Sequence, residues 1–300
     1  MNYLISLFIL LIFTACAQDQ HEKKEVAQVP KERTVKIASI DELEKLFNDI
    51  NYTSASWQAG LREVPYIYFS TVGNDWKKTS SILPVKEKKN IFFRLLAPLV
   101  LISNEEITQE RAILFNKPPN SVDVLKLAKK YRVTKTHAKE LTQQELDELK
   151  KRIDIIPLSL ALAQGAEESG WGTSRFASEG NALFGLWDYS GKGMAPAQQR
   201  KELGNYGLAR YDTPLDSVRG YMFNINIGHA YEKLRNMRQE LRKQKKKITG
   251  WELAKSLDKY SERGQGYIDG LHNMMRYNKL SQADDAYLNS TVKIHLIKAD

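Results

Sequence analysis

Two adjacent glutamates, Glu167 and Glu168, lie near the end of one expected helix. Their positions on that helix indicate which of them could act as an acid catalyst. On a helical wheel that advances about 100° per residue, Leu158, Ala161 and Leu162 fall on one apolar arc. Glu168 lies at the edge of that arc and Glu167 lies opposite its centre, so we expect Glu167 in solvent and Glu168 at the core boundary. Partial burial raises the pKa of a carboxyl group and keeps a proton available near neutral pH. Cleavage of a glycosidic bond needs such a proton on the leaving oxygen, which makes Glu168 a candidate general acid.

Glycines surround this pair of acids. Gly165, Gly170 and Gly172 leave room for a sugar ring to approach the backbone, because glycine has no side chain. A glutamate near a helix end is a plain surface residue in most proteins. The spacing alone therefore does not choose between an acid catalyst and a solvated charge.

Helical patterns dominate the elements that must hold this segment in place. A helix over residues 157–169 carries the two glutamates. Thr142 followed by Glu145 is the pattern of a capping box and predicts a helix over 142–153. Strand-like alternation is confined to short runs such as 206–211. The sequence thus predicts a mainly α fold of the α+β class.

The segment Ala163-Gln-Gly-Ala-Glu-Glu-Ser-Gly-Trp-Gly172 resembles the signature of the glucosaminidases of glycoside hydrolase family 73, and residues 173–187 continue the match. Segments 217–222 and 260–267 narrow the resemblance to the Bax-like subgroup, with a domain like that of mannosyl-glycoprotein endo-beta-N-acetylglucosaminidase. The resemblance covers roughly residues 36–282. It implies a lysozyme-like fold with a small β-hairpin and an N-terminal helical extension. It also implies hydrolysis of peptidoglycan glycan strands next to N-acetylglucosamine, without a cofactor.

By the same resemblance, Glu168 is the general acid of this family. Asn181, Trp187, Tyr260 and Tyr267 correspond to positions that line the cleft and are expected to bind substrate. Each also fits a structural role: a turn former for Asn181, a core aromatic for Trp187, and core tyrosines for the other two.

The second catalytic group is open. Many relatives carry a second glutamate on a strand element, and the position that corresponds to it here is Gly207. Glu202 is the candidate second acid, and Asp188 is a neighbouring alternative. Without a second carboxylate, the N-acetyl group of the substrate is expected to assist instead, so the stereochemical outcome stays open.

The N-terminus predicts export. Tyr3 to Phe13 is apolar but too short to cross a bilayer of about 30 Å, and Thr14-Ala15-Cys16 follows it. This resembles a bacterial lipoprotein signal, in which Cys16 becomes the lipidated N-terminus. We expect a lipid-anchored protein of the cell envelope that faces the periplasm. A plain signal peptide or a short membrane anchor is the alternative.

Composition places five segments along the chain. We expect a signal peptide at 1–15, a tether at 16–35, the N-terminal helical extension at 36–153, the glucosaminidase domain at 154–282 and a C-terminal tail at 283–300. The extension contains an apolar helix over 86–102, and Pro98 is expected to kink it.

The net charge and the histidine and cysteine residues limit which binding partners and metals are expected. The net charge of +9 favours anionic partners, and export excludes nucleic acid in favour of wall polymers or lipid headgroups. The five histidines show no zinc spacing and the single cysteine is assigned to lipidation, so no metal is expected. A lytic transglycosylase and a non-catalytic wall-binding lipoprotein stay open beside the hydrolase.

Overall fold

The computed structural model describes residues 31–134, 139–196 and 206–299. Its fold is mainly helical with a small sheet, as the sequence predicts, and is consistent with a lysozyme-like arrangement. The described residues up to Arg152 form two strands and six helices: β1 Lys31–Ile37, α1 Ile40–Asp49, α2 Ser54–Gln58, β2 Glu63–Phe69, α3 Gly73–Ile82, α4 Val85–Asn116, α5 Val122–Lys130 and α6 Gln143–Arg152.

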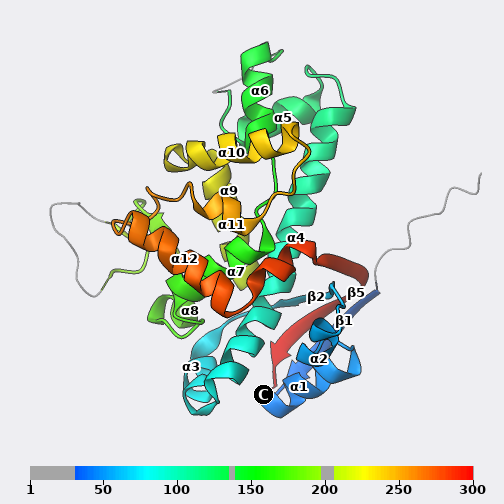
Figure 1. The fold of residues 1–300 in the computed structure, drawn as a ribbon, viewed down its shortest axis with the longest axis vertical. Coiled ribbons are helices and arrows are strands. Elements are labelled where there is room, and N and C mark those ends of the chain that lie inside the picture. The colour runs from blue at the N-terminus through cyan, green and yellow to red at the C-terminus, as the bar shows by residue number, and fades with distance from the viewer. Residues whose placement is uncertain (1–30, 135–138, 197–205, 300) are drawn as a thin grey trace, which may run out of the picture.

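The second half carries the two glutamates and the rest of the helical body. Its elements are α7 Leu158–Ser169, α8 Arg175–Gly180, β3 Trp187–Asp188, β4 Gly207–Leu208, α9 Pro214–Ile227, the 3-10 turn η2 His229–Tyr231, α10 Glu232–Lys243, α11 Gly250–Ala254, α12 Gln265–Tyr277, the 3-10 turn η3 Leu280–Asp285 and β5 Tyr287–Lys298. In Figure 1, α4 runs along the molecule, with the sheet at its lower end and α5 and α6 at its upper end.

The two ends of the described chain meet in one parallel sheet of order β1-β5-β2. The C-terminal strand β5 is central, with β1 on one side and β2 on the other (Figure 1). The expected C-terminal tail at 283–300 is therefore wrong: its Ile294 and Leu296 are buried in the core. The expected tether is also too long, because its last residues, from Lys31 on, form β1.

Most of the buried hydrophobic side chains of the described residues belong to one cluster, whose members extend from Leu43 to Leu296. It contains residues of the expected N-terminal extension, such as Leu96 and Leu149, together with Leu160 and Tyr221 of the expected glucosaminidase domain. The boundary at residue 153 is therefore not a boundary between two cores.

Helix α4 is longer than the sequence predicts. It continues through Pro98 to Asn116, and contacts α7, α9 and β2. Gly165 of α7 explains how closely α7 packs on it: a Cβ at Gly165 would lie 2.6 Å from a side-chain carbon of Leu96. Real side chains do not approach that closely, so the glycine sets the separation of the two helices.

Local capping signals are confirmed. Thr142 and Glu145 form the complete capping box of α6, and Thr213 and Thr249 cap α9 and α11 through their hydroxyls. Asp284 adds a cap that the sequence did not suggest, since it accepts from the backbone amides of Ser159 and Gly250 at the starts of α7 and α11. One carboxylate thereby fixes two helix starts.

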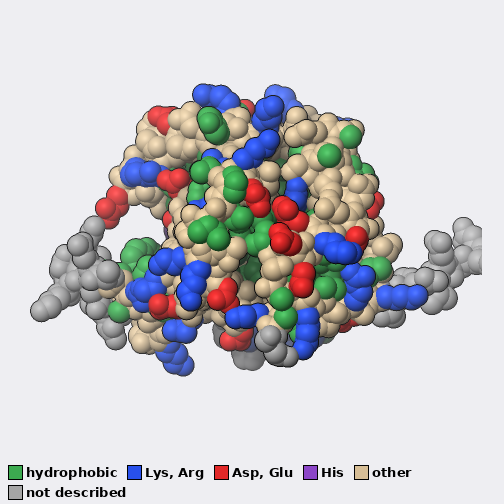
Figure 2. Space-filling view, turned by 90° about the horizontal axis from the view of Figure 1, so that it is seen from below, with side chains coloured by type: hydrophobic (Ala, Val, Ile, Leu, Met, Phe, Trp, Pro, Cys, Tyr) green, Lys and Arg blue, Asp and Glu red, His purple; other side chains and the backbone are tan. Residues whose placement is uncertain are grey.

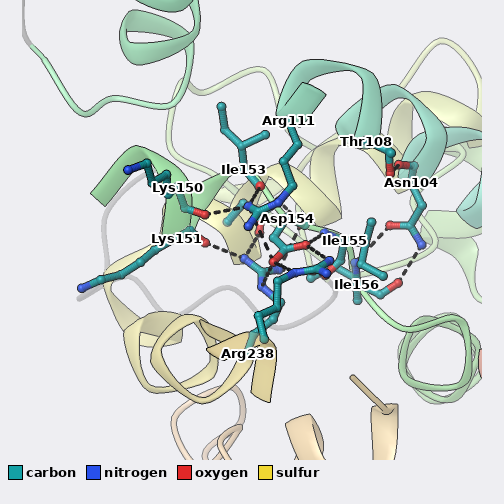
Figure 3. A network of polar contacts seen from close by, with 12 residues as sticks. Asn104, Thr108, Arg111, Lys150, Lys151, Ile153, Asp154, Ile155, Ile156 and Arg238 are labelled. Carbon is teal, nitrogen blue, oxygen red and sulfur yellow. Dashed lines mark hydrogen bonds and ion pairs between the residues drawn. The ribbon is translucent and has the colours of Figure 1, made fainter. Parts of the chain in front are cut away.

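A buried ion cluster joins α4, α10 and the segment between α6 and α7 (Figure 3). The carboxylate of Asp154 accepts two hydrogen bonds of 2.6 Å from Arg242, and Arg111 and Arg238 lie 3.7 and 3.8 Å from it. The fully buried Arg238 also donates to the carbonyl oxygens of Asp154, Ile155 and Lys151. Burial alone would raise the pKa of Asp154, but the arginines outweigh it and hold that pKa below its ordinary value.

The molecular surface mixes both signs of charge. On the face in Figure 2, lysine and arginine side chains are spread among acidic ones rather than gathered into one basic field. Within residues 31–134, 139–196 and 206–299, no helix combines the length and the apolar character needed to cross a membrane.

Candidate active site around Glu168

Helix α7 delivers the two glutamates at its C-terminal end. The helix is buried almost all round, and Gly170 ends it in the left-handed conformation, with φ of 56°. Glu167 is exposed and pairs with Arg263 at 2.8 Å, whereas Glu168 is half-buried. The helical wheel thus distinguishes the two environments correctly.

Tyr267 of α12 holds one oxygen of the candidate acid. Its hydroxyl donates a hydrogen bond of 2.9 Å to Oε1 of Glu168, and its ring stacks on Tyr260 with centroids 5.1 Å apart. Tyr267 is only 1% exposed, so its ring lies in the core behind the carboxylate of Glu168. In this structure the hydroxyl of Tyr267 contacts Glu168, and substrate binding by Tyr267 stays a prediction.

The other oxygen of Glu168 faces Gly185. A Cβ built on Gly185 would lie 3.7 Å from Oε2, and the backbone there has φ of 59°, which a glycine adopts easily. The glycine places no side chain beside Oε2, at the start of the segment that leads two residues later into the short β3–β4 hairpin.

Burial has the largest effect on the pKa of Glu168. It raises the pKa of the carboxyl group above its ordinary value, and the charge of Glu167 acts in the same direction. The hydrogen bond from Tyr267 and the charge of Arg263 oppose this but do not outweigh it. The surroundings of Glu168 therefore shift its pKa in the direction that a general acid needs.

This raised pKa predicts how Glu168→Gln changes stability. The folded parent must ionise a half-buried carboxyl as the pH rises from the ordinary pKa of glutamate through the raised folded value, and glutamine avoids that cost. Thermal unfolding should show the variant more stable than the parent at neutral pH, and equal to it below the ordinary pKa, where both are neutral. Glu167→Gln, at an exposed position, is the control. Equal parent and Glu168→Gln midpoints at every pH would contradict the raised pKa.

Trp187 and Asn181 differ in what they offer to a ligand. Trp187 on β3 is 55% exposed and meets the ring of Tyr206 edge-on, at 5.1 Å between centroids, so it is not a core residue. Asn181 is 8% exposed, accepts from Val72 N, and donates to the carbonyl oxygens of Tyr211 and Asp212. Its amide therefore joins three chain segments, which is a structural role, and substrate binding by Asn181 stays a prediction.

Tyr260 is intermediate in exposure between Trp187 and Asn181. It is half-buried, its ring is stacked on Tyr267, and its hydroxyl donates to the carbonyl oxygen of Phe184 over 3.4 Å. It supports the tyrosine that holds the acid, and its partial exposure leaves room for substrate contact.

Two of the positions considered for a second acid, Gly207 and Asp188, are among the described residues. Gly207 has no space for a side chain, because a Cβ there would lie 2.7 Å from the backbone of Gly193. Asp188 is occupied by hydrogen bonds from the amide and hydroxyl of Ser190, which lower its pKa. Glu202 lies outside the described residues, as does Cys16.

Two residues that sequence reasoning missed lie behind the acid. Gln164 and Tyr221 continue the hydrogen-bond chain that begins at Tyr267. The four-residue spacing of Gln164 and Glu168 on α7 was the available signal, because it places both on one helix face. The partner on α9 had no local signal.

Two hollows of the described chain lie away from Glu168. One of about 590 Å³ lies between α4, α5 and α9, where Glu106 pairs with Arg219. Another of about 290 Å³ lies beside Asp284, and neither is lined by Glu168. Within residues 31–134, 139–196 and 206–299, no group of three or more histidine, cysteine or acidic side chains is arranged to hold a metal ion.

Two comparisons with known proteins find a match to this chain. Residues 143–287 match the glucosaminidase family model, described as mannosyl-glycoprotein endo-beta-N-acetylglucosaminidase. Protein bax of Escherichia coli (strain K12) is 30% identical over 200 residues, which cover 64% of this chain and 70% of that protein. No solved structure matches the chain.

Proposed function

Because this chain belongs to the glucosaminidase family, a family of glycoside hydrolases that act on glycans, we propose that it is a peptidoglycan hydrolase with Glu168 as its general acid. The proposed activity is that of an endo-beta-N-acetylglucosaminidase, which cleaves the glycan strand next to N-acetylglucosamine. The observation that carries it is the half-buried Glu168, with Oε1 held by Tyr267 and Oε2 beside Gly185.

In this mechanism Glu168 protonates the leaving glycosidic oxygen as the bond to the anomeric carbon breaks. Water then adds its hydroxyl to the anomeric carbon, and its remaining proton returns to the carboxylate. The exposed ring of Trp187 is a surface on which a sugar can stack near the hairpin.

The identity of the group that helps at the anomeric carbon distinguishes two versions of the proposal. Glu202 is the candidate second acid, and the N-acetyl group of the substrate is the alternative. The backbone contact between Gly207 and Gly193 supports the alternative, since it excludes a side chain at the position where many relatives carry glutamate.

A lytic transglycosylase is the second candidate function, because the same contact leaves Glu168 without a carboxylate partner at position 207. Digestion of purified peptidoglycan with mass analysis of the fragments separates the readings. A hydrolase releases ends with a reducing N-acetylglucosamine, and a transglycosylase releases ends with an anhydro ring. Absence of any fragment would favour a non-catalytic wall-binding protein.

We also propose that the protein is anchored in a membrane of the cell envelope through lipidated Cys16, facing the periplasm. The support is the apolar run from Tyr3 to Phe13 that ends in Thr14-Ala15 before the single cysteine of the chain. Lipid chains contribute about 0.8 kcal/mol per buried CH₂ group, so two or more chains give stable attachment.

Cys16→Ser should therefore release the protein from membranes. Serine is similar in size but cannot carry the thioether-linked lipid. Cell fractionation should recover the parent with membranes and the variant in the soluble fraction, and the mass of the mature parent should include the lipid. A variant that stays membrane-bound, with its mature mass showing residues 3–13 removed, would contradict the anchor.

A further inference from the structure

A chain of three hydrogen bonds runs from the core of the protein to Glu168. Tyr221 on α9 donates to Oε1 of Gln164 at 2.7 Å, Nε2 of Gln164 donates to the hydroxyl of Tyr267 at 3.0 Å, and that hydroxyl donates to Oε1 of Glu168 at 2.9 Å. Tyr221 and Gln164 are completely buried. Water therefore does not compete for the inner links.

The three hydrogen bonds donate in one direction, from Tyr221 toward Glu168. A tyrosine hydroxyl has a single proton, and the hydroxyl of Tyr267 already accepts a hydrogen bond from the amide of Gln164. Its proton is therefore left for Glu168. The amide of Gln164 donates to Tyr267 only while its oxygen faces the other way, and the hydroxyl of Tyr221 satisfies that oxygen.

We propose that Tyr221 and Gln164 are positioning residues that fix which oxygen of Glu168 carries the acid proton. Because Oε1 receives the hydrogen bond from Tyr267, the proton of the neutral carboxyl group stays on Oε2, the oxygen beside Gly185. The proton then lies on the side from which a glycosidic oxygen can approach. This inference rests on the proposed role of Glu168 as general acid.

Removal of the Tyr221 hydroxyl should reverse the hydrogen bond between Gln164 and Tyr267. The ring of Tyr221 is stacked on Phe184 at 3.9 Å, so phenylalanine should keep its position. The oxygen of Gln164 then loses its donor, and a rotated amide can accept from Tyr267. Ionised Glu168 loses the hydrogen bond from Tyr267, and the proton of the neutral form is no longer confined to Oε2.

The other charged and titratable groups that face Glu168 stay in place in this variant. They are Glu167 on α7, Tyr231 in η2, and Tyr260 and Arg263 in the segment between α11 and α12. A changed titration of Glu168 in Tyr221→Phe is therefore assignable to the chain.

The test follows the pKa of Glu168 by carbon NMR of labelled glutamate side chains, with the Glu168→Gln protein identifying the signal. Tyr221→Phe should raise this pKa by about one unit or more, since a hydrogen bond to a charged group is worth at least that much. With peptidoglycan, kcat should fall and its alkaline limb should move to higher pH, while KM stays unchanged. Tyr131→Phe is the matched control, because Tyr131 is a buried tyrosine that donates to Glu110 instead.

A double variant separates positioning from simple loss of stability. In the Tyr267→Phe background the chain is already cut, so Tyr221→Phe should leave the pKa of Glu168 unchanged. An unmoved pKa in the single variant, or an equal shift in both backgrounds, would overturn the proposal. The NMR readout does not depend on turnover. A shifted pKa of Glu168 in a protein that cuts no glycan would therefore refute the proposed function, but it would not refute the hydrogen-bonded network.

Discussion

Glu168→Gln is expected to lower peptidoglycan turnover by about 10²–10⁴-fold, the usual contribution of a general acid. Glutamine keeps the size of the side chain, and its oxygen still accepts the hydrogen bond from Tyr267. It has no acid proton for the leaving oxygen. The release of reducing sugar ends from purified peptidoglycan measures the loss, mainly in kcat.

The neighbouring acid is the matched control for this result. Glu167 is exposed and paired with Arg263, so Glu167→Gln should retain turnover near that of the parent. Equal losses in the two variants would mean that the end of α7 is only structurally sensitive. Parent-like turnover in Glu168→Gln would remove Glu168 from the chemistry.

Asp154→Asn is expected to destabilise the fold by about 3–5 kcal/mol, which is the typical cost of leaving buried charges without their partner. Asparagine is similar in size, but it cannot neutralise Arg238, Arg242 and Arg111, which surround this position. Such a loss is a large share of the stability of an ordinary domain. The midpoint of urea unfolding at neutral pH measures it.

The difference in stability between the parent and Asp154→Asn should depend on pH in a definite direction. The folded pKa of Asp154 is depressed, so its contribution is fully present above the ordinary pKa of aspartate and is lost as the pH falls through the folded value. The parent and Asp154→Asn should therefore converge in acid. Asp123→Asn, which removes an exposed partner of Lys117, should change little at any pH. A constant difference down to low pH would contradict the ion-cluster account.

Much of the local structure was predictable because its causes are local. The capping pattern of Thr142 with Glu145 occurs within one turn, and the different environments of Glu167 and Glu168 follow from the position of each on one helix. These features need no knowledge of distant partners. The resemblance to glucosaminidases likewise identified the acid-bearing segment, since it depends on a continuous motif.

The features that sequence reasoning missed depend on contacts between distant segments. Strand β5 was taken for a tail because its parallel partners, β1 and β2, lie more than 200 residues away in the chain. The structural role of Asn181 was also missed, because its amide joins Val72 to Tyr211 and Asp212. The motif identified the residue without showing which way its amide points.

Peptidoglycan digestion in water enriched in heavy oxygen tests the central claim most directly. If Glu168 is the acid of a hydrolase, the parent should release fragments whose reducing N-acetylglucosamine carries the heavy oxygen, and Glu168→Gln should release almost none. Fragments that end in an anhydro sugar without the label, or equal labelled release by both proteins, would contradict the account.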